Sequence, residues 1–391
     1  MGNNTGGMQM KIGLLGHGVV GSGVTAITDS CAVKKVRRLE VSRILVKDEW
    51  EMTDPRCTTN VEDILSDPEI EIVAECMGGI EPAHTFVRRA LESGKHVVTS
   101  NKKMFAAYCG ELFELAKENG VSIRYEASCG GGIPWISNLT RIRRLEPVTS
   151  FRGIFNGTTN YILSRMARTG SDFAQNLAEA QKLGYAEKDP TDDIAGYDVR
   201  YKTAITAMKA FGAIVDSGEI PTLGIADVSA DDIRWASENG YVLKLFGAGK
   251  NLDDGVSLWV MPVMTGDKQV FAHISDNFNA VESESPTLGP AMFVGQGAGS
   301  LPTAHAVVQD LLDIYQDQDT EAAYAERKRV NNDTVCARFY VRTAKPEAFA
   351  EVCERSAGTG AFLTKEMPLS ELLAMMKGCG DEHVFAAMVM E

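Results

Sequence analysis

Two lysines, Lys102 and Lys202, are candidates for a proton-transfer step, because a positioned lysine can give or take a proton. Lys202 follows Asp198 by four residues, so on a helix both side chains lie on one face. The same spacing is common in exposed ion pairs worth about 0.3–0.5 kcal/mol, which is the structural alternative. Lys102 comes just after the apolar run His96–Thr99, and open α/β sheets bind ligands where their strands end. Its neighbour Lys103 fits a plain solvated lysine.

A glycine-rich turn near the start of the chain has the spacing that binds a dinucleotide. The apolar run Lys11–Leu15 is followed at once by Gly16-His17-Gly18-Val19-Val20-Gly21, which is GxGxxG after a predicted strand. The first glycine allows a tight turn, the second lets the backbone approach a pyrophosphate, and the third lets the helix pack closely on the strand. The start of that helix then faces the phosphates. Because so short a motif also occurs in ordinary turns, its context has to decide.

The segments after this turn alternate between strand and helix. Strands are predicted at Glu40–Val46, Ile70–Ala74, His96–Thr99 and Val121–Glu126, and helices at Pro82–Leu91 and Gly110–Glu118. This alternation predicts a parallel sheet with helices on both faces, which is the architecture of a Rossmann-type nucleotide-binding domain.

The residue after the second predicted strand bears on the choice of cofactor. An acidic side chain at that place binds the ribose 2′-hydroxyl of NAD, and a cation suits the 2′-phosphate of NADP. Here Lys47 and Asp48 are adjacent, so either can point to the ribose. We expect NADP or NAD, with a slight preference for NADP through Lys47, although a solvated surface lysine fits this position equally well.

The composition limits the classes of partner. The net charge is −14, and such a surface repels nucleic acid and anionic membranes. The eight cysteines are scattered without a CxxC pair, which favours a reducing cytoplasm over a disulfide framework. The first ten residues lack the basic start and apolar run of a signal peptide, and no apolar stretch approaches the ~18 residues that span a membrane. We therefore expect a cytoplasmic protein with neither nucleic-acid nor membrane partners.

Six segments of the chain resemble the homoserine dehydrogenase family and follow one another in the family's order. They are GKHVVTSNK at 94–102, YEASCGGGIP at 125–134, GIFNGTTNYIL at 153–163, LGYAEKDPT at 183–191, the spacing DxxGxDxxxK from Asp193 to Lys202, and FVGQGAGSLPT at 293–303. Six ordered segments are far more specific than any one of them. The resemblance implies an NAD(P)-dependent oxidoreductase that interconverts L-aspartate 4-semialdehyde and L-homoserine, in threonine, methionine and isoleucine biosynthesis.

The resemblance also implies roles for particular residues. It makes Lys202 and Lys102 the catalytic lysines, and Lys202 is expected to carry the proton. It places Glu187 and Asp198 at the substrate, whose ammonium group two carboxylates suit. It places Gly184 and Tyr185 beside the substrate too. The expected cofactor contacts are Gly16, Gly18, Val19, Val20, Gly21, Lys47, Met77, Gly78, Ser100, Lys102 and Gly297.

The glycine-rich loop after Val121–Glu126 is the expected site of a structural cation. The resemblance to homoserine dehydrogenases implies a monovalent metal, Na⁺ or K⁺, in this loop. The matching ligands are Glu126 and the backbone oxygens of Cys129, Gly131 and Ile133. Oxygen ligands suit a hard cation. Cys129 replaces the valine usual in the family, which a backbone ligand tolerates. The alternative is a tight loop without a metal.

We predict an α/β protein with four parts. They are a Rossmann-type domain at 1–140, an α+β substrate-binding and dimerisation domain at 141–300, a helix returning to the nucleotide domain at 301–330, and a short α/β appendage at 331–391. The appendage resembles a threonine-sensing ACT domain in position and order but lacks its glycine-centred ligand loop, so regulation and plain oligomerisation both stay open. The expected assembly is a homodimer or a homotetramer.

Further elements are predicted after residue 140. The strands are Val148–Phe155, Ser257–Met264, Val270–Ile274, Val335–Arg342 and His383–Met390, and the helices are Asp172–Lys182, Arg200–Ala210, Thr303–Asp313, Pro346–Arg355 and Leu369–Met376.

Two other functions compete with the family's reaction. One is an amino-acid dehydrogenase of similar architecture that acts on a different semialdehyde, against which the segments NGTTNYIL and GYAEKDPT argue. The other is a cofactor-binding sensor that has lost the chemistry. A decayed site should have lost at least one of Lys102, Glu187, Asp198 and Lys202, and all four are present.

Overall fold

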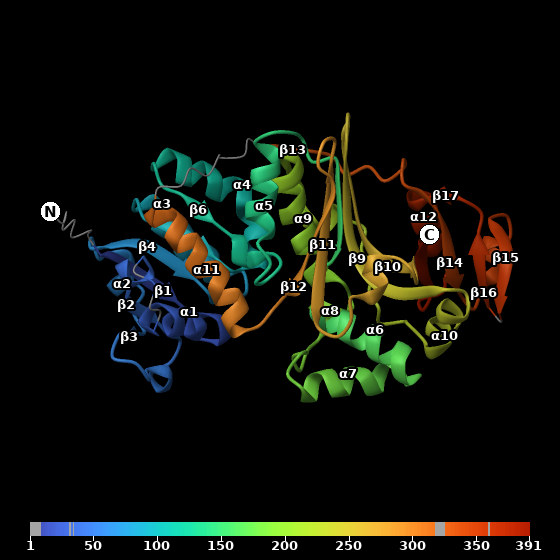
Figure 1. The fold of residues 1–391 in the computed structure, drawn as a ribbon, viewed down its shortest axis with the longest axis horizontal. Helices are drawn as coiled ribbons and strands as arrows, with labels where there is room; N and C mark the ends of the chain where they lie inside the picture. The colour runs from blue at the N-terminus through green and yellow to red at the C-terminus, as the bar shows by residue number, and fades with distance from the viewer. Residues whose placement is uncertain (1–8, 31–32, 34, 317–324, 359) are drawn as a thin grey trace. The chain divides into compact units, whose positions relative to one another are not determined.

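The computed structural model describes residues 9–30, 33, 35–316, 325–358 and 360–391 (Figure 1). The chain forms two compact units. The first holds residues 1–140 and 296–325, and the second holds residues 141–295 and 326–391. Among the described residues, no helix combines the length and the apolar character needed to cross a membrane.

The first unit is built on a six-stranded sheet in which every pairing is parallel. Its order is β3-β2-β1-β4-β5-β6. The strands are β1 (Met10–Leu15), β2 (Leu39–Leu45), β3 (Cys57–Thr58), β4 (Ile70–Glu75), β5 (His96–Thr99) and β6 (Ile123–Arg124). The predicted parallel sheet is confirmed. The last strand is shorter than predicted, because Glu126–Ser128 forms a 3₁₀ turn.

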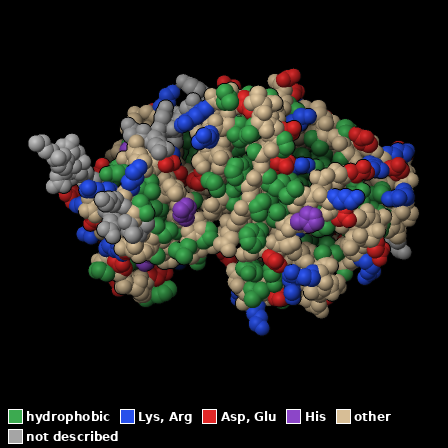
Figure 2. Space-filling view, viewed as in Figure 1, with side chains coloured by type: hydrophobic (Ala, Val, Ile, Leu, Met, Phe, Trp, Pro, Cys, Tyr) green, Lys and Arg blue, Asp and Glu red, His purple; other side chains and the backbone are tan. Residues whose placement is uncertain are grey.

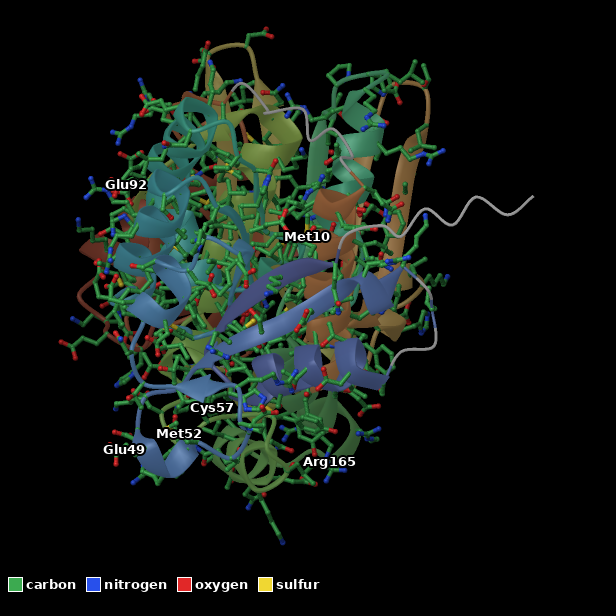
Figure 3. All side chains as sticks on the ribbon, turned by 90° about the vertical axis from the view of Figure 1, so that its left-hand side faces the viewer. Met10, Glu49, Met52, Cys57, Glu92 and Arg165 are labelled. Atoms are coloured by element: carbon green, nitrogen blue, oxygen red, sulfur yellow. The ribbon has the colours of Figure 1, made fainter. Side chains whose placement is uncertain are left out.

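Helices cover this sheet. They are α1 (Val19–Ser30), α2 (Glu62–Leu65), α3 (Ala83–Glu92), α4 (Lys102–Glu118) and α11 (Ser300–Tyr315). Helix α5 (Trp135–Arg143) begins in this unit and ends in the second. Figure 3 turns this unit toward the viewer, with Met10 at the start of β1, Cys57 in β3 and Glu92 at the end of α3. Short 3₁₀ turns at Val36–Arg38 and Glu49–Glu51 flank β2.

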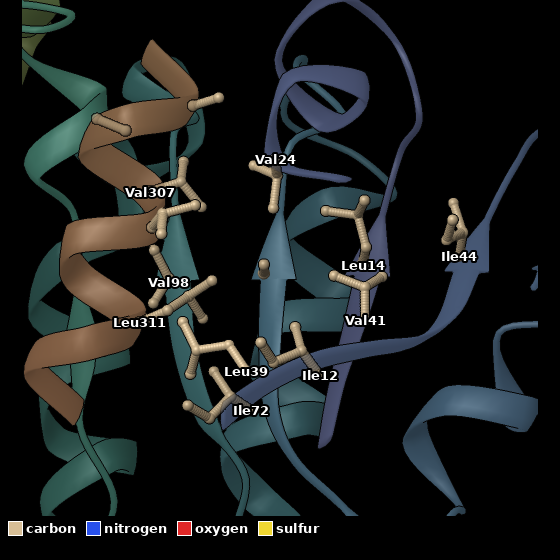
Figure 4. Close-up of a cluster of buried hydrophobic side chains, with 14 of the residues drawn as sticks. Ile12, Leu14, Val24, Leu39, Val41, Ile44, Ile72, Val98, Val307 and Leu311 are labelled. Atoms are coloured by element: carbon tan, nitrogen blue, oxygen red, sulfur yellow. The ribbon is translucent and has the colours of Figure 1, made fainter. Parts of the chain in front are cut away.

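The core of the first unit lies between the sheet and the helices α1 and α11 (Figure 4). Strand side chains such as Ile12, Leu14 and Val98 meet Val24 of α1 and Leu311 of α11, and all five are fully buried. Removing such side chains from water is worth roughly 1.5–3 kcal/mol each, so this contact fixes α11 against the nucleotide-binding sheet despite its distance along the chain.

The second unit is built on a longer, mostly antiparallel sheet. Its order is β12-β11-β7-β9-β10-β18-β14-β16-β15. The strands are β7 (Ser150–Ile154), β9 (Tyr241–Leu252), β10 (Gly255–Gly266), β11 (Phe278–Ser285), β12 (Gly289–Gln296), β14 (Cys336–Arg342), β15 (Cys353–Gly358), β16 (Ala361–Thr364) and β18 (Phe385–Met390). Strand β18 pairs in parallel with β10, so the C-terminal strands continue the sheet of residues 150–296.

The helices of the second unit are α6 (Gly157–Thr169), α7 (Phe173–Lys182), α8 (Thr191–Ile194), α9 (Tyr197–Phe211), α10 (Ala230–Glu238) and α12 (Leu369–Gly378). The small strands β8 (Ala213–Ile214) and β13 (Glu326–Arg327) pair with each other, and β17 (Met367–Pro368) pairs with β14. A 3₁₀ turn covers Ser217–Glu219.

Helix α9 is buried along almost its whole length and packs on β9 and β10. The approach is so close that a Cβ atom at Gly247 of β9 would lie 2.2 Å from Thr203 Oγ1 of α9. Only glycine fits at that contact, because real Cβ atoms do not come so near another atom. The sequence therefore brings the helix that carries Asp198 and Lys202 directly onto the sheet.

Two predicted elements of the second unit are wrong. Val270–Ile274 is a 3₁₀ turn over Val270–His273, not a strand, and a short apolar run does not distinguish the two. The predicted helix Pro346–Arg355 is a 3₁₀ turn over Pro346–Phe349, after which Cys353 enters β15 and pairs with Thr364 of β16. Strand β9 was not predicted, because Gly247 and Gly249 lower the strand tendency of its sequence.

Candidate active site

The glycine turn after β1 has the tight geometry that its sequence predicts. Gly16 has φ +92°, and a Cβ there would lie 2.9 Å from the carbonyl oxygen of Cys76. A Cβ at Gly21 would lie 2.0 Å from the carbonyl oxygen of Gly16, so helix α1 starts directly against the turn. At Gly18 a Cβ would meet no atom within 4 Å. The turn is thus closed by protein at Gly16 and Gly21 and open at Gly18, which fits the close approach of a pyrophosphate.

Helix α11 packs against this turn. Ser300 Oγ donates a hydrogen bond of 2.6 Å to the carbonyl oxygen of Val19, whose side chain is exposed. A Cβ at Gly23 would lie 2.8 Å from the Cβ of Ala304. Gly23 lies outside the GxGxxG motif, and the sequence pattern did not single it out.

The glycine-containing segment at residues 296–299 lies against the glycine-rich loop that follows β6. The N–H of Gly132 donates to the carbonyl oxygen of Gln296 at 3.1 Å. A Cβ at Gly131 would lie 2.5 Å from the carbonyl carbon of Gly297. The two loops are therefore in backbone contact, and the buried Gly297 lies within the first unit with the other expected cofactor residues.

The other expected cofactor residues lie at the carboxyl ends of strands in the first unit. Lys47 is exposed two residues after β2, and its N–H donates to Glu51 Oε2 at 3.0 Å. Met77 and Gly78 follow β4, and Ser100 follows β5. The Ser100 N–H donates to the carbonyl oxygen of Glu75 at 3.1 Å. These turns share the edge of the sheet where the fold binds ligands.

A buried carboxylate, Glu75 at the end of β4, organises this edge. Its Oε1 accepts from the N–H of Met77 at 2.8 Å, and its Oε2 accepts from the hydroxyl of Thr99 at 2.6 Å. Burial raises the pKa of Glu75, although these hydrogen bonds act in the opposite direction. Asn101 donates to the carbonyl oxygen of Gly79 at 2.6 Å and caps α4 by accepting from the N–H of Met104. Lys102, half-buried, is the first residue of that helix, so Glu75 and Asn101 fix where it starts.

Sequence reasoning missed Glu75 and Asn101. The available signal was a carboxylate placed at the end of a strand that is otherwise apolar, together with an N-cap residue just before Lys102. Helix α4 begins at Lys102 and not at the predicted Gly110, because the Asn101 cap sets its start.

The loop of the expected cation site holds the buried carboxylate Glu126, and a second buried carboxylate, Asp310 of α11, binds its backbone. Glu126 accepts from the N–H groups of Ile136 at 2.9 Å and Ser137 at 2.8 Å, so its side chain caps α5. The N–H of Glu126 in turn donates to Asp310 Oδ2 of α11 at 2.8 Å. Burial raises the pKa of both groups, and the Glu126 charge raises that of Asp310 further. Cys129 and Ile133 are buried beside them.

The structure neither places a metal in this loop nor contradicts one. Among the described residues, no three His, Cys, Asp or Glu side chains come together as a metal site. The expected ligand set does not depend on such a group, since Cys129, Gly131 and Ile133 would contribute backbone oxygens. The carboxylate of Glu126 and these backbone oxygens are ligands of the kind that suits a hard cation.

In the second unit, Asp198 and Lys202 form a buried pair on α9. The distance from Lys202 Nζ to Asp198 Oδ2 is 2.8 Å, and the residues are 6% and 2% exposed. Lys202 Nζ also donates to the carbonyl oxygen of Phe155 at 2.7 Å. The alternative of an exposed ion pair is therefore wrong for these residues.

Asn156 joins this pair to the start of α6. Its Nδ2 group donates to Asp198 Oδ2 at 2.8 Å and to Asp193 Oδ1 at 2.7 Å. Its Oδ1 accepts from the N–H of Thr159 at 2.8 Å, so Asn156 is the N-cap of α6. The same side chain therefore caps α6 and holds two carboxylates of the DxxGxD segment.

The expected substrate-binding residues Gly184, Tyr185 and Glu187 lie in a surface loop of the second unit. Thr158 Oγ1 donates to the carbonyl oxygen of Tyr185 at 2.7 Å, which ties the loop to α6. The Tyr185 ring contacts that of Tyr161, with centroids 4.9 Å apart. Gly184 has φ +77° and Glu187 is exposed. The structure thus brings together Lys202, Asp198 and Asn156, and leaves Glu187 outside this hydrogen-bonded cluster.

Comparison with known proteins decides the family. The model described as "Homoserine dehydrogenase, NAD binding domain" matches residues 16–126, and the model described as "Homoserine dehydrogenase" matches residues 134–312. The homoserine dehydrogenase of Bacillus subtilis is 38% identical over 317 residues, which cover 79% of this chain and 73% of the relative. That of Lactococcus lactis is 36% identical over 395 residues, covering 96% of this chain and 91% of the relative. The chain belongs to the homoserine dehydrogenase family.

Solved structures of homoserine dehydrogenases are similar over nearly the whole chain. The enzyme from Thiobacillus denitrificans superposes with a TM-score of 0.88 at 31% identity and covers 98% of both chains. That of S. aureus at pH 8.5 gives a TM-score of 0.76 at 30% identity, covering 97% of this chain and 99% of the other. The predicted Rossmann-type domain, the homoserine dehydrogenase catalytic domain and the oxidoreductase class are confirmed by these matches.

Proposed function

We propose that this chain catalyses the interconversion of L-aspartate 4-semialdehyde and L-homoserine, with Lys202 as the proton carrier. The nicotinamide cofactor supplies or removes the hydride at the carbon of the aldehyde or alcohol. In the reducing direction the carbonyl oxygen gains a proton from the Lys202 ammonium group, and in the oxidising direction the lysine takes the proton of the hydroxyl. The observation that carries the proposal is the buried Lys202–Asp198 pair, held by Phe155 and Asn156.

The substrate's ammonium group requires carboxylates. Asp198 and Glu187 are proposed to bind it, with Gly184 and Tyr185 shaping the loop around it. The buried Asp198 supports this role, since a carboxylate removed from water attracts a cation more strongly than an exposed one does. The exposed Glu187 lies on a surface loop, and in this proposal it approaches the substrate when that loop closes over it.

Lys102 is proposed to face the substrate and the nicotinamide from the first unit. Its place at the start of α4, fixed by Asn101 and Glu75, supports this role. A cation at this point balances the negative charge of the substrate's carboxylate and helps to orient it.

The cofactor is proposed to be NADP or NAD, with a slight preference for NADP through Lys47. The open space at Gly18, the first turn of α1 at Val19, Val20 and Gly21, and the strand-end residues Met77, Gly78, Ser100 and Gly297 support a dinucleotide along this edge of the sheet. Lys47 is exposed and can reach a 2′-phosphate without first breaking a buried contact.

A monovalent cation, Na⁺ or K⁺, is proposed at Glu126 and the backbone oxygens of Cys129, Gly131 and Ile133. Its role would be structural, because the charge would offset the neighbouring carboxylates of Glu126 and Asp310 and stiffen the loop that touches Gly297. Both carboxylates are buried, and a buried charge is costly unless a partner of opposite charge offsets it, which supports a cation at this place.

We also propose that 1–140 binds the cofactor, that 141–300 binds substrate and mediates dimerisation, that 301–330 returns to the nucleotide domain, and that 331–391 is an ACT-like or oligomerising appendage. The α11–α1 contact supports the third assignment.

The exposed Val294 of the edge strand β12 supports a homodimer or homotetramer. Acidic and basic side chains are interspersed on the face in Figure 2. The described cysteines are all free, as a reducing compartment would leave them. We propose a cytoplasmic place for this chain, in threonine, methionine and isoleucine biosynthesis.

The test is a direct assay with L-homoserine, following the absorbance of the reduced cofactor with NAD and NADP in parallel. The variants are Lys202→Ala and, as a matched control, Lys182→Ala at the exposed end of α7. Turnover that collapses only in Lys202→Ala establishes both the reaction and its proton carrier. A folded protein that binds either cofactor but turns over neither with homoserine would instead be a sensor, and the proposal would fail.

A further inference from the structure

Among the buried lysines, Lys244 of the second unit is the least exposed in the described part of the chain and has no part in the mechanism above. It belongs to β9 and is 1% exposed. Its Nζ is 2.6 Å from the carbonyl oxygen of Ile274, 2.9 Å from Asn160 Oδ1 and 3.4 Å from Ser164 Oγ. An ammonium group has three N–H donors, and here three acceptors surround it.

The burial of this lysine is unfavourable for stability alone. Removal from water lowers the pKa of Lys244 to about 8, while the carboxylate of Asp276, paired with Arg168 of α6, acts in the other direction. An apolar side chain of similar length would fill the same space without a charge to desolvate. A lysine at this position therefore needs an explanation other than packing.

One acceptor of Lys244, the carbonyl oxygen of Ile274, lies in the turn that leads into β11, and the other two are side chains of α6. Asn160 of α6 accepts from Lys244 and donates with Nδ2 to the carbonyl oxygens of Ile274 at 3.1 Å and Phe278 at 2.9 Å. The turn is unusual, because Asp276 has φ +56°, a conformation that L-residues rarely adopt. Lys244 and Asn160 together hold this turn in its place.

The turn is also pressed against the start of α6. A Cβ at Gly157 would lie 2.7 Å from the carbonyl oxygen of Asn277, so the two backbones are in contact. A displacement of the turn would therefore also displace the N-terminus of α6, which Asn156 caps.

Asn279, the second residue of β11, connects the turn to the catalytic lysine. It is fully buried, and its Nδ2 donates to the carbonyl oxygen of Phe155 at 2.8 Å. Lys202 Nζ donates to the same oxygen at 2.7 Å. The carbonyl of Phe155 is thus held between Asn279 and Lys202, and the register of Asn279 depends on the turn that Lys244 secures.

We propose that Lys244 is a positioning residue, which fixes the turn at residues 274–278 and, through Asn279 and the carbonyl of Phe155, sets the position of the Lys202 ammonium group. This inference rests on the proposed role of Lys202. It assigns Lys244 no contact with substrate or cofactor, so its effect should appear in the chemical step rather than in binding.

The test compares Lys244→Met with Lys250→Met, an exposed lysine on the same strand, in steady-state homoserine oxidation. We expect kcat to fall by about tenfold to a hundredfold in Lys244→Met, because a small misplacement of a catalytic group has effects of that size. The KM values for homoserine and cofactor should stay within about threefold of the native values, and a solvent deuterium isotope effect on kcat should increase as proton transfer becomes slower. Lys250→Met should match the native chain in all of these.

Asn279→Ser tests the other end of the same connection and leaves Lys244 in place. If both residues act through the Phe155 carbonyl, the double variant should lose less than the product of the two single losses. The inference is overturned if Lys244→Met keeps native kcat, or if its loss lies in KM with an unchanged isotope effect. Should Lys244→Met fail to fold, native kcat in Asn279→Ser overturns it equally. Turnover that survives in Lys202→Ala would instead defeat the proposed role of Lys202 as the proton carrier.

Discussion

Lys202 Nζ lies 2.8 Å from Asp198 Oδ2, one turn earlier on α9, and both side chains are buried in the second unit. A buried ion pair stabilises a fold weakly, because desolvation of the two charges offsets their attraction. Here the pair is held by further neutral partners, Asn156 on the carboxylate and the Phe155 carbonyl on the ammonium group. Such an arrangement keeps both charges pre-oriented, which is the requirement for binding a cationic substrate next to a proton carrier.

Asp198→Asn should weaken substrate binding and leave cofactor binding unchanged. The amide keeps the size of the side chain and loses the charge that attracts the substrate ammonium, and hydrogen bonds to charged groups are worth about 1.5–3 kcal/mol. We expect kcat/KM for homoserine to fall by about tenfold or more and the KM of the cofactor to stay unchanged. Steady-state kinetics against both substrates provide the measurement, with the exposed Glu238→Gln as the control. A native kcat/KM in Asp198→Asn would exclude this residue from the substrate site.

Gly18→Ala should leave the fold intact and weaken the binding of the cofactor. The added methyl group meets no protein atom within 4 Å, whereas it would stand where a pyrophosphate has to approach. We expect the Kd of the cofactor, measured by fluorescence titration, to rise by about tenfold or more while Tm is unchanged. Gly378→Ala at the end of α12 is the matched control, because its Cβ also meets open space. Unchanged cofactor affinity in Gly18→Ala would mean that the dinucleotide does not cross this turn.

Lys47→Ala should reveal which cofactor the chain uses. If Lys47 contacts the 2′-phosphate, its removal should raise the KM for NADP by about tenfold and leave the KM for NAD unchanged. Arg43, an exposed cation earlier on β2, provides the control variant Arg43→Ala. Equal effects on both cofactors, or none, would show that Lys47 is a solvated surface residue.

The parts of the fold that depend on local pattern could be predicted from the sequence. The glycine turn and the parallel strands β1, β2, β4 and β5 follow from residues that are close together in the chain. Two short segments failed for a local reason, since Val270–His273 and Pro346–Phe349 are too short to show a period.

The parts of the site that depend on distant residues could not be predicted in this way. Whether Asp198 and Lys202 are buried or exposed depends on β9, whose glycines make it a poor strand in isolation and a good packing surface for α9. Glu75 and Lys244 gained a role only through partners 24 and 84 residues away, Thr99 and Asn160. Spacing within a motif carries no information on such contacts, because they arise when elements pack together.

Asp310→Asn should weaken the response of the protein to monovalent cations. A cation bound at the loop of Glu126 stabilises the folded state by mass action, and the neighbouring Asp310 charge adds to its attraction. We expect Na⁺ or K⁺, substituted for choline at constant ionic strength, to raise the Tm of the native chain by about 2–4 °C and that of Asp310→Asn by less. Asp313→Asn, one turn later and paired with Arg124, is the control. A native chain with the same Tm in choline would argue against the cation site.

Glu146→Gln should change how stability depends on pH. Glu146 accepts hydrogen bonds from the hydroxyls of Ser285 and Thr287 and from the N–H of Leu288, and these lower its pKa from 4.5 to about 2. Because the folded-state pKa lies below the unfolded value, the carboxylate's stabilisation is complete above pH 4.5 and is lost as pH falls toward 2. Glu146→Gln should therefore be less stable than the native chain at neutral pH, and urea-unfolding curves of the two should converge as the pH approaches 2. Parallel curves over this range would show that the ionised form of Glu146 does not clamp the turn between β11 and β12.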